Sequence, residues 1–150
     1  MLGWEPKKSG WVNPPRATMS EPDRAATLSA DALVVRGGRN LAEHFRQGSG
    51  VTVGGDGQIR DVSVNSAAHR SLPELTAPNR MTGYPGIPHQ QVGVTTVGAI
   101  RTAGGAVIPS PTRANPNHAT LSGLTPEDAS ELFRPTIPNP SRRSSAQERP

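Results

Sequence analysis

The sequence contains no cysteine, few aromatic residues and no long apolar run. Without cysteine there is no disulfide framework, no thiolate nucleophile and no cysteine-ligated zinc. No stretch approaches the roughly 18 apolar residues of a membrane-spanning helix, so we expect no membrane insertion. The opening letters MLGWEPKKSGWVNPP lack the apolar segment of a secretory signal peptide. The chain is therefore expected to stay in the cytosol or to be exported by a specialised machine.

Positive charge is in modest excess, with 16 Lys and Arg against 12 Asp and Glu and a formal net charge of +4. Much of the excess lies near the C-terminus, at Arg134, Arg142, Arg143 and Arg149. A basic tail more often increases solubility than binds a nucleic acid. Two Trp, two Phe and one Tyr are also a small stock for stacking on bases. Nucleic-acid binding is thus the weaker interpretation of the charge.

Composition divides the chain into one domain with two polar ends. Gly and Pro are frequent, at 16 each, and only 33% of residues are hydrophobic. Residues 1–31 carry Pro, Ser, Ala and charge without apolar periodicity and are predicted to be a disordered leader or linker. Residues 139–150 are predicted to be a disordered basic tail. Between them, residues 32–138 alternate apolar runs with turn signals, as expected of one folded domain.

Apolar runs and turn signals predict a mixture of strands and short helices. Strands are expected at 32–36, 51–53, 59–64, 92–97, 106–108 and 118–121, where β-branched and apolar residues precede glycines or turns. Short helices are expected at 41–47 after a capping Asn40, near Leu75 after the capping box of Ser71 and Glu74, at 99–103, and after Thr125. The sum is an α+β domain.

Several catalytic and metal-binding patterns are missing. The four histidines, His44, His69, His89 and His118, have no metal-ligand spacing, so no metal site is expected. There is no Walker loop and no Gly-x-Ser-x-Gly elbow. The glycine-rich letters at 54–57 are typical of a hairpin turn.

Arg36 is the most informative single residue, because it ends an apolar strand directly before Gly37 and Gly38. Burying an arginine there is costly without an anionic partner, and its planar fork suits a phosphate or carboxylate. The alternative is an arginine that extends from an edge strand into water.

Later segments add a pattern to Arg36. The strand at 59–64 runs into Ser63 and Ser66, and Gln91 opens the β-branched strand at 92–97, which is followed by Ile100. This order resembles the Arg-Ser-Glu class of ADP-ribosyltransferases, in particular the small domains at the C-termini of polymorphic bacterial toxins of the Rhs type. The resemblance covers about residues 33–108. It implies a small split β-sandwich with short helices and flexible termini, and NAD as the substrate.

The resemblance also implies roles for individual residues. Arg36, with Gly37 beside it, would hold the phosphate or ribose of NAD, and Ser63 would hold the nicotinamide ribose, with Ser66 as the alternative. Gln91 stands where the family has its catalytic glutamate. Gln91 carries no charge, so it cannot stabilise a cationic ribose as a carboxylate does. A variant that works with Gln91, a carboxylate from elsewhere and a relative that only binds all stay open.

The function implied is mono-ADP-ribosyl transfer from NAD to a protein or RNA acceptor, for example in the translation machinery of a target cell. Such a toxin would be part of a larger protein or be secreted by a specialised system, would act in the target-cell cytoplasm, and would have an immunity partner. Two alternatives remain: an RNA-cleaving toxin that uses His89, His118, and Arg101 or Arg113 as acid and base groups, and a non-catalytic interaction module in which Arg36 is solvated.

Overall fold

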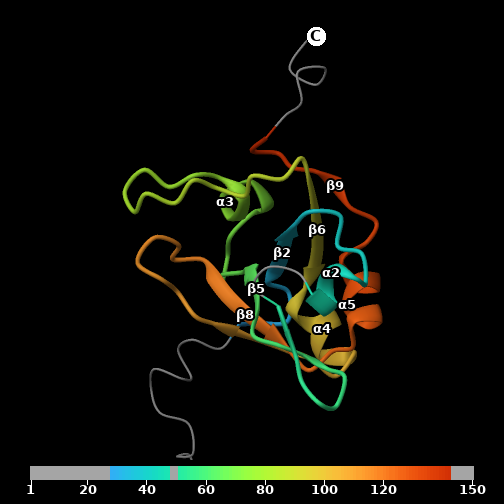
Figure 1. Cartoon of the computed structure of the whole chain (residues 1–150). Helices are drawn as coiled ribbons and strands as arrows, with labels where there is room; N and C mark the ends of the chain where they lie inside the picture. The colour runs from blue at the N-terminus through green and yellow to red at the C-terminus, as the bar shows by residue number, and fades with distance from the viewer. Residues whose placement is uncertain (1–27, 48–50, 143–150) are drawn as a thin grey trace, which may run out of the picture.

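The computed structural model describes residues 28–47 and 51–142, which form a six-stranded and a two-stranded antiparallel sheet with short helices (Figure 1). The expected α+β class is confirmed. In chain order the elements are β2 (Leu33–Gly37), α2 (His44–Gln47), β3 (Thr52–Val53), β4 (Ile59–Arg60), β5 (Val62–Asn65), α3 (Leu72–Thr76), β6 (Gln91–Thr96), α4 (Val97–Thr102), β7 (Ala106–Pro109), β8 (His118–Ser122), α5 (Pro126–Phe133) and β9 (Ile137–Pro138).

The large sheet has the strand order β7-β8-β5-β2-β6-β9, and its centre is narrow. β2 is aligned with β6 over five residue pairs, and β5 with β8 over four. Between β2 and β5 there is one aligned pair, Val35 with Asn65. The sheet therefore consists of two halves that meet at a single aligned pair.

Each face of the large sheet carries its own apolar core. On one face α2, α4 and α5 cover a cluster that includes Val34, Phe45 and Phe133. The rings of Phe45 and Phe133 stack with centroids 6.0 Å apart. On the other face Val35 and Val92 pack with Leu75 of α3 and with Ile87. Neighbouring residues of β2 thus point into different cores, as strand geometry requires.

Local sequence signals fix the ends of two helices as predicted. Ser71 Oγ accepts a hydrogen bond from the backbone N–H of Glu74 at 3.3 Å, and Glu74 Oε1 accepts one from the N–H of Ser71 at 2.8 Å, so the predicted capping box starts α3. Thr125 caps α5, whose first residue is Pro126 and which ends before Pro135.

Other boundaries differ from the prediction because tertiary contacts decide them. Asn40 does not cap a helix: it lies in the left-handed region at φ 57°, and α2 begins only at His44. The strand predicted at 59–64 is broken at Asp61, also left-handed at φ 54°. As a result β4 pairs with β3 in the small sheet, whereas β5 enters the large one. α4 begins at Val97, earlier than expected, and β9 was not predicted.

Both predicted ends contribute residues to the folded part. Leu28, placed in the leader, is buried, and its carbonyl accepts a hydrogen bond from Arg101 Nη2 at 2.7 Å. Asn139, placed in the tail, is buried and donates to the carbonyls of Ile87 and His89. The rest of the predicted leader, residues 1–27, and of the tail, residues 143–150, lies outside the described residues. In the described part, no helix has the length and apolar character to cross a membrane.

Candidate functional site

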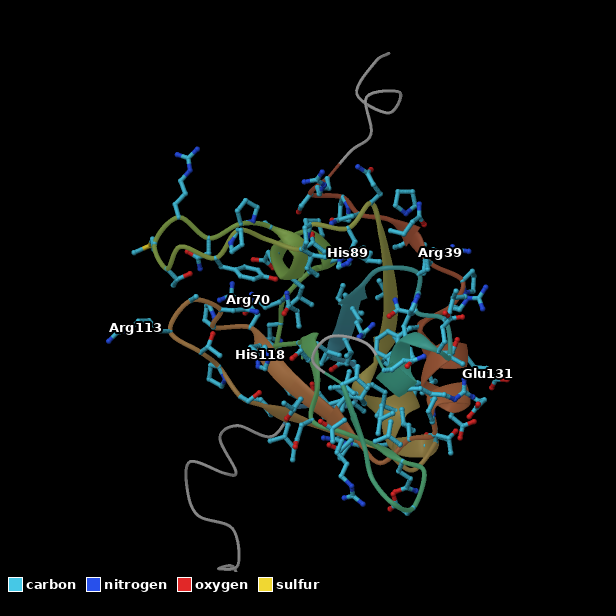
Figure 2. All side chains as sticks on the ribbon, viewed as in Figure 1. Arg39, Arg70, His89, Arg113, His118 and Glu131 are labelled. Carbon is cyan, nitrogen blue, oxygen red and sulfur yellow. The ribbon has the colours of Figure 1, made fainter. Side chains whose placement is uncertain are left out.

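A cavity of about 290 Å³ opens where the two halves of the large sheet meet. Its volume is near the lower end of the range for small-molecule sites. It is lined by residues of β2, β5 and β8 and of two loops: Val35, Arg36, Gly37, Ser63, Val64, Asn65, Tyr84, Ile87, Pro88, His89, Asn115 and His118. In Figure 2, His118 lies on β8 and His89 on the segment that leads into β6. No residue in this lining is acidic.

The cavity extends into the gap between β2 and β5. The side chains of Val35 and Asn65 point toward this cavity. Because side chains alternate along a strand, the neighbouring residues Arg36 and Val64 start from the opposite face of the sheet. Arg36 and Val64 nevertheless line the cavity as well. The single aligned pair Val35–Asn65 explains this, because the strands have no further aligned pair beyond it.

Arg36 is held by neutral groups. Its Nη1 donates to Asn40 Oδ1 at 2.9 Å, and its guanidinium carbon lies 4.7 Å from the centroid of the Phe45 ring. Its Nε is buried without a hydrogen-bond partner among the described residues. Burial lowers the pKa of Arg36, since it disfavours the charged form, although an arginine stays charged at neutral pH. A desolvated cation with an unused donor favours an anionic ligand.

Asn40 sets the position of this guanidinium. Its Nδ2 donates to the carbonyls of Arg36 and Gly38, at 3.0 and 3.1 Å, while its Oδ1 accepts from Arg36. The backbone carbonyl of Asn40 accepts a hydrogen bond from Ser130 Oγ of α5 at 2.8 Å. Asn40 is fully buried. It therefore fixes both the backbone after β2 and the side chain of Arg36.

Ser63 and His118 are neighbours on the cavity wall. Asn65 is aligned with His118 and Ser63 with Thr120, so Ser63 and His118 are diagonal neighbours on one face of the β5–β8 pair. Ser63 Oγ lies 3.2 Å from His118 Nε2. The other ring nitrogen, Nδ1, lies 3.0 Å from the carbonyl oxygen of Ser110 and 2.9 Å from its hydroxyl.

Asn65 anchors the back of the cavity. Its Nδ2 donates to the carbonyl of Leu75 at 2.8 Å and to the Tyr84 hydroxyl at 2.9 Å, and its Oδ1 accepts from Asn115 Nδ2 at 2.9 Å. These bonds satisfy a buried amide and tie two loops to the centre of the sheet.

A second cavity, of about 310 Å³, shares Tyr84 and Asn115 with the first and is also lined by Arg70, Glu74 and Arg80.

Three of the five predicted site residues lie together. Arg36, Gly37 and Ser63 line the first cavity. A Cβ atom on Gly37 would lie 2.4 Å from His89 Nδ1, so the ring packs directly against the glycine backbone. Ser66 is not in the lining: it is buried, and its hydroxyl donates to the carbonyl of Leu33 at 2.6 Å.

Gln91 is also outside the cavity lining. Its neighbour Val92 packs in the same core as Val35, so the side chain of Gln91 leaves β6 on the opposite face. There its Oε1 accepts a hydrogen bond from Thr136 Oγ1 at 3.0 Å. The structure thus separates Gln91 from Ser63.

The sequence named Asn40 only as a helix cap, and it named His118 only at the start of a strand and as an acid or base candidate for RNA cleavage. The role of Asn40 in holding Arg36 and the pairing of Ser63 with His118 were not predicted. No group of three or more His, Asp and Glu suited to a metal ion occurs in the ranges that the structure covers. Comparison of the chain with protein-family models, with curated proteins and with solved structures found no match.

Proposed function

We propose that this domain is an NAD-dependent mono-ADP-ribosyltransferase of the toxin type, which transfers ADP-ribose from NAD to a macromolecular acceptor. One observation carries the proposal. Arg36 and Gly37 of β2 and Ser63 of β5, which the family resemblance assigns to NAD binding, line one cavity. The acceptor would be a protein or RNA, with the translation machinery of a target cell as one example. A toxin of this kind would also need an immunity protein in the cell that makes it.

Arg36 is suited to hold the diphosphate or a ribose of NAD. Its Nη1 is occupied by Asn40, but its buried Nε has no partner in the described part of the chain. A phosphate oxygen would bind instead at Nη2, which makes no hydrogen bond to the described residues and, unlike Nε, is not fully buried, through a charge-assisted bond. The lining adds no negative charge to oppose it.

The size of the site agrees with an extended ligand. A cavity of about 290 Å³ encloses part of a dinucleotide rather than all of it. The neighbouring cavity, which shares Tyr84 and Asn115, offers space for the remainder. Arg80 in its lining also suits a ligand that carries phosphate, whereas Arg70 there is already paired with Glu74 at 3.4 Å.

The proposal is tested with NAD labelled in its ADP-ribose part. The protein is incubated with the labelled NAD and a cell extract, and both released nicotinamide and labelled macromolecules are measured. Arg36→Ala should reduce labelling by at least tenfold, and Arg36→Lys should restore it only partly, because lysine lacks the planar fork. Arg60→Ala is the control, since Arg60 of β4 is an exposed arginine that lies outside the cavity lining and pairs with Asp56. A folded wild-type protein that releases no nicotinamide and labels nothing would refute the proposal.

RNA cleavage is the second candidate, because His89 and His118 both line the cavity that contains Arg36. Two imidazoles beside a cation could act as acid and base on a phosphodiester. End-labelled RNA incubated without NAD separates the two functions. Cleavage by the wild type that is lost in His89→Ala and His118→Ala would favour the nuclease, and intact RNA would exclude it for the substrates tried.

A further inference from the structure

We infer that His118, acting through the Ser63 hydroxyl, accepts the proton of the acceptor during ADP-ribosyl transfer, and that Gln91 has no part in this step. The inference rests on the proposed function and deepens it. It starts from the contact between Ser63 Oγ and His118 Nε2, 3.2 Å apart on the cavity wall.

The surroundings of His118 decide which ring nitrogen carries hydrogen. The carbonyl oxygen of Ser110, 3.0 Å from Nδ1, can only accept a hydrogen bond, so it favours the tautomer with the hydrogen on Nδ1, in which the Ser110 hydroxyl, 2.9 Å from Nδ1, is a second acceptor. Nε2 then has a free electron pair directed at Ser63, and the Ser63 hydroxyl donates to it. Ser110 thereby holds the ring in the tautomer that can take up a proton, as an orienting acceptor does in other hydroxyl–imidazole pairs.

The chemical step balances with these groups. A hydroxyl of the acceptor attacks the anomeric carbon of the nicotinamide ribose, and a new C–O bond forms. The bond from that carbon to the nicotinamide nitrogen breaks, and its electron pair returns to the pyridinium ring, which leaves as neutral nicotinamide. The acceptor proton passes to the Ser63 oxygen while the Ser63 proton passes to His118 Nε2. His118 becomes a cation and releases the proton to water after the products leave.

Gln91 lacks both the position and the chemistry for this role. An amide has no basic electron pair to take up a proton. Its side chain bonds Thr136 on the face of β6 opposite to Val92 and is not in the cavity lining. His118 is in that lining and contacts Ser63 directly.

The test compares the rate of labelled ADP-ribose transfer among variants of the full chain. His118→Ala should lower kcat by about 100-fold or more, the usual contribution of a general base, and should change the KM for NAD less than about threefold because Arg36 still holds the ligand. Added imidazole should restore the transfer rate of His118→Ala. Pyrazole, a ring of the same size but a far weaker base, should not restore it. Gln91→Ala should keep its rate within about threefold of the wild type.

A second variant covers the event that His118→Ala does not fold. His118→Asn keeps a side-chain N–H near the Ser110 carbonyl but has no base, so it should fold and be as slow as His118→Ala. Equal rates for wild type and His118→Asn, or rescue of His118→Ala by both rings, would overturn the inference while nicotinamide release by the wild type still supports the transferase. A wild type that releases no nicotinamide would overturn the proposed function, and the inference with it.

Discussion

Replacing Asn40 should reveal how much of the site is held by one buried amide. Asn40→Ala removes three hydrogen bonds: from Arg36 Nη1, and to the carbonyls of Arg36 and Gly38. Asn40 is fully buried, so water cannot readily replace them. Each such bond contributes about 1 kcal/mol net. The three together are worth about 3 kcal/mol of the free energy of unfolding.

The backbone adds a further contribution at this position. Asn40 is left-handed, at φ 57°, where asparagine is tolerated but alanine costs roughly 1–2 kcal/mol. Asn40→Ala should therefore lower the free energy of unfolding by about 4–5 kcal/mol. Asn40→Gly loses the same hydrogen bonds without the backbone strain and should lower it by about 3 kcal/mol.

Urea denaturation of the wild type and both variants at neutral pH measures these differences. A loss below about 1 kcal/mol in both variants would show that the amide does not hold the site. Equal losses in the two variants would show that the left-handed backbone carries no cost for alanine. Either result would refute the reasoning about Asn40, and with it the account of how Arg36 is positioned.

Other positions give sharper local tests. Gly93→Ala would place a Cβ 2.4 Å from a carbonyl oxygen of α5 and should destabilise the fold by about 1–3 kcal/mol in urea denaturation, whereas Gly55→Ala, with no atom within 4 Å of its Cβ, is the control. Ser71→Ala should cost about 1 kcal/mol, because it removes the helix cap of α3. Hydrogen bonds from Ser71, first from its backbone N–H and then from its hydroxyl, lower the pKa of Glu74. The ionised Glu74 carboxylate therefore stabilises the fold above the ordinary glutamate pKa, and this stabilisation is lost as the pH falls through the lowered pKa. Between those two pH values the free energy of unfolding, measured by urea denaturation, should fall more for the wild type than for Glu74→Gln. An equal fall in both proteins would contradict a stabilising role of the Glu74 carboxylate.

Local signals were enough to predict where α3 and α5 begin. The Ser71 box and Thr125 before Pro126 lie within a few residues of the groups they satisfy, so short-range chemistry decides them. β-branched runs similarly predicted most of β6 and β7. The α+β class follows from these elements.

Features that depend on distant segments could not be predicted in the same way. β9 has two residues, Ile137 and Pro138, and exists because the chain after α5 returns beside β6. The left-handed conformation of Asn40 depends on its contacts with β2 and α5. Strand register decides that Ser63 meets His118 and that Gln91 faces away, and no local pattern contains that register.

The strand order of the large sheet also has a consequence for how the chain folds. Apart from β7 and β8, the strands paired in its two halves are far apart in sequence: β2 with β6, and β5 with β8. Long loops must close before β2 pairs with β6 and before β5 pairs with β8, and such non-local pairing is typical of slow folding, in roughly milliseconds to seconds. The junction at Val35 and Asn65 gains its neighbours only after both halves exist. The cavity built at that junction needs strands from both halves, so no fragment that lacks either half can contain it.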